Sequence, residues 1–134
     1  MKLQLLLPIL LLAITSSCSS DNEKTLENEL DNTRYYVKYE CELNTQHLNI
    51  VKTISFTTEN GNETINTTDM SWEGTYGPLK KGTTVHLDCQ IPSNYQYSRG
   101  NFARIYVSRE KEPFVIKAED SGKHNISLSY TIDF

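Results

Sequence analysis

In this 134-residue chain, the residues whose types best suit reaction or binding are the three cysteines and a short polar segment that contains two tyrosines. Cys41 and Cys89 each fall on the apolar face of an alternating stretch, so a disulfide between them and two separate buried thiols both fit the pattern. A disulfide would close a loop of about 48 residues and stabilise the fold by roughly 4 kcal/mol on the chain-entropy model. A cysteine nucleophile needs an exposed thiolate beside a base, and the inward positions argue against one.

Metal and catalytic motifs are weakly represented. His86 and Asp88, two residues apart on one strand face, form the one metal-like pair, and two scattered ligands are explained more simply by a solvated strand face. The sequence has no Gly-rich phosphate loop and no CxxC, HExxH or GxSxG motif. Asp and Glu fall on outward strand positions and turns, where solvation accounts for them. We therefore expect no metal, no cofactor and no enzymatic activity.

The segment 92–102 combines tyrosines, an arginine and a glycine with Ser, Asn and Gln between two expected strands. Tyr and Arg supply contact area and fixed donors beside adaptable polar neighbours, which is typical of binding loops. The sequence predicts a partner-binding loop made of Tyr95, Tyr97, Arg99, Gly100, Asn101 and Phe102. The alternative is a polar loop whose tyrosines lie flat on the edge of the fold. His86, Asp88 and Arg104 are expected to form a polar face beside it.

The N-terminus carries the pattern of a targeting peptide. Leu3 to Ile14 is an apolar run of about 18 Å as a helix, shorter than the ~30 Å core of a bilayer, and it therefore indicates a signal peptide. The following Thr15-Ser16-Ser17-Cys18 resembles the lipobox of bacterial lipoproteins, although Thr15 stands where such motifs usually carry Leu. The resemblance implies a signal peptide over residues 1–17 and a lipidated, palmitate-bearing Cys18. An ordinary secretory peptide with an incidental cysteine is the alternative.

Residues 18–33 are expected to form an acidic tether after the lipidated cysteine. Its beginning, a serine pair followed by acids at 19–24, is similar to the export signal of Bacteroidota-type surface lipoproteins. That resemblance implies attachment to the outer membrane with the domain facing outward, and a periplasm-facing lipoprotein is the alternative. Two leucines in residues 19–33 bury too little surface to hold a helix in water.

From residue 34 onward apolar and polar residues alternate. In the stretch 35–43 the odd-numbered residues are apolar or aromatic, and the even-numbered ones are mainly polar or charged. The same habit recurs at 54–58, 85–91, 103–107, 114–118 and 126–134. We place Ile105, Ile116 and Ala118 on inward rows, and Asn60-Gly61 suits a tight hairpin turn. These features predict an all-β fold, a single antiparallel β-sandwich of about seven strands, in one domain at residues 34–134.

Three stretches carry a resemblance: RYYVKYE, SWEGTYGPLKKGTTVHLDCQ and ARIYVSREKEPFVIKAEDSG. They resemble small β-sandwich lipoproteins and the extracytoplasmic domain of the mycobacterial membrane protein small family. The resemblance implies an immunoglobulin-like sandwich over roughly residues 34–132. Its motifs are structural, and it implies no catalytic group.

The whole chain has a net charge of −4, and such an acidic chain is poorly suited to bind the backbone of a nucleic acid.

Three functions fit the features described above. The first function is a non-catalytic, lipid-anchored binding module that recognises a protein or glycan through the predicted loop. The third is a structural or assembly accessory of the outer membrane, in which an edge strand pairs with a partner strand.

The second function is inhibition of a secreted cysteine peptidase. The stretch RGNFARIYVSRE resembles the reactive segment of staphostatin-type inhibitors, in which a loop Gly lies in the cleft of the target. The resemblance implies that Gly100 and Asn101 flank the uncleaved bond and that Arg99 and Phe102 fill neighbouring pockets.

Overall fold

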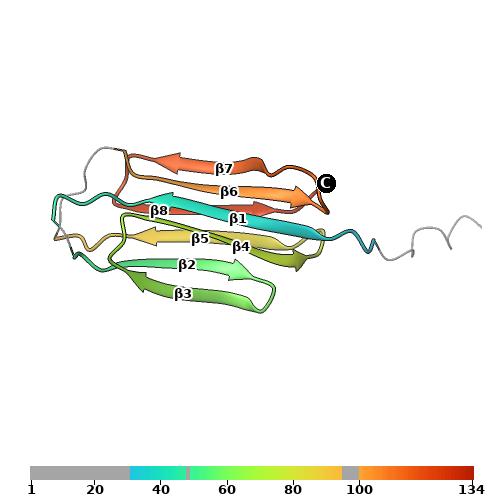
Figure 1. Ribbon diagram of the computed structural model, residues 1–134, viewed down its shortest axis with the longest axis horizontal. Helices are drawn as coiled ribbons and strands as arrows, with labels where there is room; N and C mark the ends of the chain where they lie inside the picture. Colours follow the sequence, from blue (N-terminus) through green and yellow to red (C-terminus); the bar gives the residue numbers. More distant parts are fainter. Residues whose placement is uncertain (1–30, 48, 95–99) are drawn as a thin grey trace, which may run out of the picture. The chain divides into compact units, whose positions relative to one another are not determined.

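The computed structural model describes residues 31–47, 49–94 and 100–134, and these residues form an antiparallel β-sandwich without helices (Figure 1). The predicted all-β sandwich is confirmed, with eight strands rather than about seven. The additional strand comes from residues 61–79, which the turn around Met70 divides into two strands. The strands are β1 (Tyr35–Glu42), β2 (Lys52–Thr58), β3 (Gly61–Thr67), β4 (Ser71–Leu79), β5 (Thr84–Gln90), β6 (Phe102–Arg109), β7 (Val115–Ser121) and β8 (Asn125–Thr131).

The eight strands make two sheets of four, in the orders β4-β1-β6-β7 and β3-β2-β5-β8. All six pairings are antiparallel, so consecutive strands alternate in direction along the molecule. One end, the N-terminal pole, therefore collects residues 31–34, 59–60, 80–83, 110–114 and 132–134 (Figure 1). The opposite end, the loop pole, collects the described parts of 43–51, 68–70, 91–101 and 122–124.

The core between the sheets is built from the alternation seen in the sequence. On β1, Tyr35, Val37, Tyr39 and Cys41 are all at most 1 % exposed, and each lies between half-buried neighbours. Equivalent rows come from β2, β5, β6 and β8, which contribute Ile54, Phe56, Val85, Leu87, Cys89, Ala103, Ile105, Val107, Ile126 and Leu128. Period-two patterning thus decides which face of each central strand is buried.

The edge strand β7 departs from the predicted inward row. The register between β6 and β7 shifts at Ile105/Tyr106, so Ala118 pairs with Ile105 while Ile116 pairs with Tyr106. A shift of one residue turns a side chain to the other face of a sheet. Ala118, beside the inward Ile105, packs against the core, whereas Ile116, beside the outward Tyr106, lies on the outer face and is 47 % exposed. The prediction that Ile116 points inward is therefore wrong.

Two buried polar groups hold parts of the sandwich together. The Tyr39 hydroxyl on β1 donates to the backbone oxygen of Thr57 on β2, 2.7 Å away, and so links the two sheets. The Lys52 side chain is 1 % exposed, and its Nζ donates to the carbonyl oxygens of Thr68 and Asp69 at 2.9 Å. These bonds satisfy polar groups that would otherwise lie unpaired in the interior.

Residues 31–134 form a compact unit of their own, which contains all eight strands and the whole described core. A chain that begins after Cys18 therefore retains every residue that builds the sandwich. Across the described ranges there is no helix of the length and apolar character that a membrane crossing requires.

Candidate functional site

The loop pole gathers the described ends of the segment predicted to bind a partner. Asn44 donates its backbone N–H to Asn101 Oδ1 at 2.7 Å, and Gly122 donates its N–H to the Asn101 carbonyl at 2.9 Å. Ile91, which directly precedes the segment, donates its N–H to the carbonyl of His124 at 3.3 Å. The two stems of the segment are thus fixed to the neighbouring connections of the same pole.

The predicted loop residues separate into three groups. Tyr95, Tyr97 and Arg99 lie outside the described residues, as does Cys18. Gly100 is exposed, with φ +107°, a backbone conformation that favours glycine. Asn101 and Phe102, by contrast, are built into the fold.

Asn101 requires a correction. It was predicted to contact a partner, but its side chain is 0 % exposed and its Oδ1 is occupied by the backbone N–H of Asn44. Its role is to hold the stem of the loop. The sequence alone indicates an exposed side chain, because Asn101 is a polar residue within a polar segment. Its hydrogen-bond partner, Asn44, lies 57 residues away in the chain and can be identified only in the structure.

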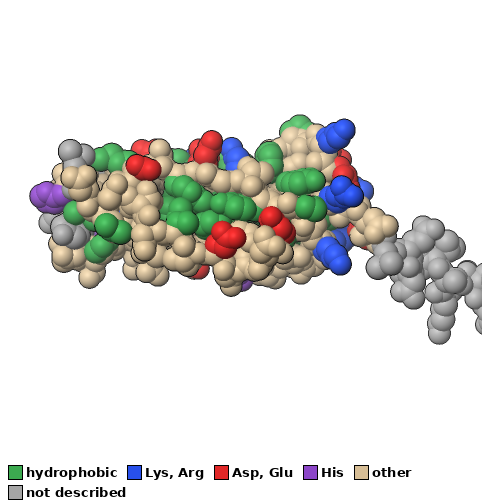
Figure 2. Space-filling view, turned by 60° about the horizontal axis from the view of Figure 1, so that its bottom comes forward, with side chains coloured by type: hydrophobic (Ala, Val, Ile, Leu, Met, Phe, Trp, Pro, Cys, Tyr) green, Lys and Arg blue, Asp and Glu red, His purple; other side chains and the backbone are tan. Residues whose placement is uncertain are grey.

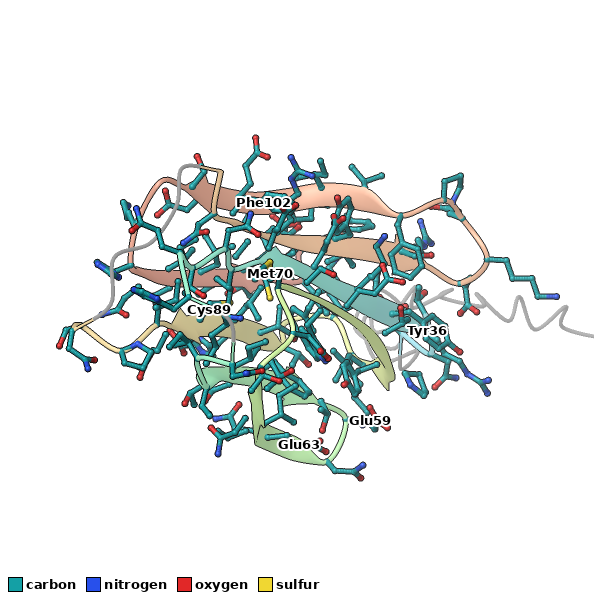
Figure 3. All side chains as sticks on the ribbon, turned by 60° about the vertical axis from the view of Figure 1, so that its left-hand side comes forward. Tyr36, Glu59, Glu63, Met70, Cys89 and Phe102 are labelled. Carbon is teal, nitrogen blue, oxygen red and sulfur yellow. The ribbon has the colours of Figure 1, made fainter. Side chains whose placement is uncertain are left out.

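Phe102 lies on the outer face of the β4-β1-β6-β7 sheet, at the start of β6. Figure 3, turned so that the loop pole comes forward, shows Phe102 on β6 and Cys89 on β5, one in each sheet. The ring is half-buried, and the Arg104 guanidinium stands over it at 4.3 Å from the ring centroid. Phe102 borders a groove on each side, one of about 340 Å³ and one of about 330 Å³.

The larger groove runs over β1, and beside Cys41 and Phe102 it is lined by three carboxylates and a tryptophan that the sequence analysis did not single out. Its lining residues are Glu40, Cys41, Glu42, Ser71, Trp72, Glu73 and Phe102. Glu42 accepts a hydrogen bond from the Asn44 side chain at 2.7 Å. The register places Glu40 beside Glu73 and Glu42 beside Ser71, so these four residues line up on two neighbouring strands. In the sequence, the outward positions of Glu40, Glu42 and Glu73 indicate exposed carboxylates. The pairing of β1 with β4, which brings them to one groove, is known only from the structure.

The smaller groove is organised around Arg104. Its Nε contacts Glu119 Oε2 at 3.2 Å, and its Nη1 lies 3.8 Å from Glu40 Oε2. Tyr106 donates its hydroxyl to the same Glu40 oxygen at 2.5 Å, and this bond, with some burial, raises the pKa of Tyr106. Charge pairing on a rigid sheet holds these side chains in place before any ligand arrives.

The expected polar face of His86, Asp88 and Arg104 does not form. His86 and Asp88 are on β5, where they alternate with buried Val85, Leu87 and Cys89 and so point away from the core. Arg104 is on β6 of the other sheet, on the opposite outer face of the sandwich. That prediction is wrong because two strands that follow each other in sequence, β5 and β6, belong to different sheets.

The side formed by β3 and β4 adds an aromatic cluster. The Phe56 ring lies 4.7 Å from that of Trp72 and 4.9 Å from that of Tyr76 between ring centroids. Trp72 and Tyr76 flank Gly74 on the same face of β4, and a Cβ at Gly74 would come within 2.7 Å of the Tyr76 ring. Figure 2 brings this side forward and shows hydrophobic side chains gathered midway along it, with acidic side chains beside them.

Basic side chains collect at the N-terminal pole instead, as Figure 2 also shows. No group of three or more His, Cys, Asp or Glu side chains within residues 31–47, 49–94 and 100–134 is placed to hold a metal ion. The side chains that line the two grooves can stack, form hydrogen bonds and pair charges.

Comparison of this chain with protein-family models, curated proteins and solved structures found no match. The assignment of a function therefore rests on the geometry described above.

Proposed function

We propose that this chain is a lipid-anchored, non-catalytic binding module of the cell envelope, which recognises a protein or a glycan through its loop pole and the adjoining Phe102 face. Cys18 carries the lipid, and residues 18–33 connect it to the sandwich. The domain is attached to the outer membrane and faces outward.

The observation that most supports this proposal is that the two poles lie at opposite ends of the strands. The chain leaves the sandwich toward its anchor at residues 31–34, whereas the described ends of segment 92–102 lie at the other end of the strands (Figure 1). A tether attached at the first pole leaves the second pole free to face away from the membrane. The half-buried ring of Phe102, flanked by fixed charged groups next to that pole, suits recognition.

The inhibitor alternative has less support. It requires the bond between Gly100 and Asn101 to enter the cleft of a peptidase, yet Asn101 is 0 % exposed and hydrogen-bonded to Asn44 and Gly122. Presenting that bond would require the stem of the segment to leave the fold.

The test is capture of a partner from envelope and culture supernatant with residues 19–134 as bait. A Tyr97→Ala/Phe102→Ala variant serves as the loop-pole control and Lys111→Ala as the matched control at the N-terminal pole. We expect one protein or polysaccharide to bind the unaltered chain and Lys111→Ala, and to be lost from the loop-pole variant. Equal capture by all three baits, or by none, would refute the assigned surface.

The anchor is tested separately with the full chain in its own cell. Metabolic palmitate label should enter the unaltered chain and be absent from Cys18→Ser. An unlabelled chain that fractionates with the supernatant would refute lipid anchoring and leave the capture result unaffected.

A further inference from the structure

Cys41 and Cys89 lie opposite each other between the two sheets. Cys41 is on β1 and is 1 % exposed, and Cys89 is on β5 and is 0 % exposed. Both are free thiols in the structure, and the two sulfur groups are close enough to hydrogen-bond to each other. A pair of thiols in contact across two sheets is the starting arrangement for an inter-sheet disulfide.

The pair also lies close to the two stems, which are the described ends of segment 92–102. Cys89 is two residues before Ile91, where one stem of that segment begins. Cys41 pairs in register with Ala103, two residues after Asn101 at the end of the other stem. The two sulfur atoms therefore connect the strand that enters the segment with the strand beside its exit.

We propose that Cys41 and Cys89 are joined in an inter-sheet disulfide by exchange with a disulfide oxidant before the two sheets close, and that this bond fixes both stems of segment 92–102. The second half rests on the proposed function, because it assigns the fixed stems to a recognition surface. The first half is independent of any partner.

The exchange proceeds in two balanced steps. The thiolate of one cysteine attacks one sulfur of the oxidant, forms a mixed disulfide and releases the other oxidant sulfur as a thiolate that takes up a proton. The second cysteine then loses its proton and attacks the sulfur of the first cysteine, which forms the Cys41–Cys89 bond and expels the second oxidant thiol. Two electrons pass from the pair to the oxidant, and both thiol protons end on its two reduced sulfurs.

Burial sets the order of events. With exposures of 1 % and 0 %, neither sulfur in the closed sandwich can be reached by an oxidant of the size of glutathione. The exchange therefore takes place while β1 and β5 are still separate, and the closed fold preserves whichever redox state it received.

The first experiment uses residues 19–134, in which these are the two remaining cysteines. The reduced, unfolded chain is refolded with oxidised glutathione, while the reduced, folded chain is exposed to the same reagent. Thiols are then counted by maleimide labelling in denaturant, and the mass is measured. We expect the refolded chain to lose both thiols and two hydrogen atoms in mass, and the folded chain to keep both thiols.

Free thiols after oxidative refolding, or equal oxidation of the two samples, would overturn the proposed exchange. Cys41→Ala and Cys89→Ala, refolded in the same way, identify any glutathione adduct that mimics the loss of labelling. The unaltered reduced chain remains the comparison if a variant does not fold.

The second experiment measures the stems themselves. Amide hydrogen exchange at Ile91, Asn44 and Gly122, whose N–H groups tie the stems, should slow on the order of tenfold in the oxidised chain. Gly82 and Glu110, whose amides bond at the N-terminal pole, are the matched controls and should slow less.

Equal slowing at both poles would overturn the effect on the stems. Absence of any captured partner in either redox state would count against the proposed function alone, since the exchange and thiol measurements do not involve a partner.

Discussion

Asn101 offers the sharpest test of how the fold supports the predicted loop. Replacing it with alanine removes the Oδ1 that accepts the backbone N–H of Asn44 at 2.7 Å and leaves that N–H without its partner. An unpaired buried donor costs about 1–3 kcal/mol. Among the described residues Asn101 Nδ2 has no hydrogen-bond partner. The alanine variant also removes this unpaired buried donor, and the removal offsets part of the loss in the free energy of unfolding. The expected net loss for Asn101→Ala is about 1–2 kcal/mol, or a fall in Tm of roughly 4–8 °C per kcal/mol.

The assay is urea denaturation of residues 19–134, with the midpoint and the slope measured separately. A lower midpoint at unchanged slope shows that stability has changed and that the unfolded state has not. The matched control is Asn94→Ala, because Asn94 is an exposed asparagine of the same segment and should stay within about 0.5 kcal/mol of the unaltered chain.

A second variant separates the hydrogen bond from the burial. Asn101→Asp keeps the acceptor but places a carboxylate where the side chain is 0 % exposed. Burial raises the pKa of a carboxyl group, so this variant should lose stability as pH rises through that value and recover it in acid. If Asn101→Ala matched the stability of Asn94→Ala, the idea that this side chain holds the stem would have to be abandoned.

Three further outcomes follow from the described contacts. Tyr39→Phe should lose about 1–2 kcal/mol with the bond to Thr57. Burial raises the pKa of Tyr39, so above pH 10 the unfolded chain releases this proton first, and the free energy of unfolding should fall by about 1.4 kcal/mol per pH unit for this group. Alkaline titration of the unaltered chain against Tyr39→Phe measures that difference, and identical slopes would contradict it. Lys52→Met should cost about 1–3 kcal/mol in chemical denaturation, because the carbonyls of Thr68 and Asp69 lose their donor, whereas the exposed Lys123→Met should change stability by less than about 0.5 kcal/mol. Phe102→Ala should change the free energy of unfolding by less than about 1 kcal/mol and abolish partner capture, and a large loss of stability would assign the ring to the fold instead.

The sequence was sufficient for those parts of the fold that local patterning controls. Tyr35 to Leu43 alternates as predicted, and every inward position of that row is buried. A hairpin does join β2 and β3 next to Asn60-Gly61, but its two turn residues are Glu59 and Asn60, and Gly61, with its positive φ, is the first residue of β3.

Features that depend on strand pairing could not be predicted in this way. Ile116 faces outward because of a register shift with β6, and the alternation within β7 carries no sign of it. Asn101 is buried because Asn44 is its partner, and the groove beside Phe102 exists because β1 pairs with both β4 and β6. Each of these facts joins residues that are far apart in the chain.

The alternating strand direction has a consequence for how this domain could diversify. Connections that are widely separated in the sequence, namely the described parts of 43–51, 68–70, 91–101 and 122–124, belong to one end of the sandwich. Insertions or exchanges at four independent places would therefore reshape a single surface, while the core rows and the connections of the other end stay as they are. The architecture is consequently a natural scaffold for loop grafting, in which new specificities can be tried at one pole without rebuilding the protein.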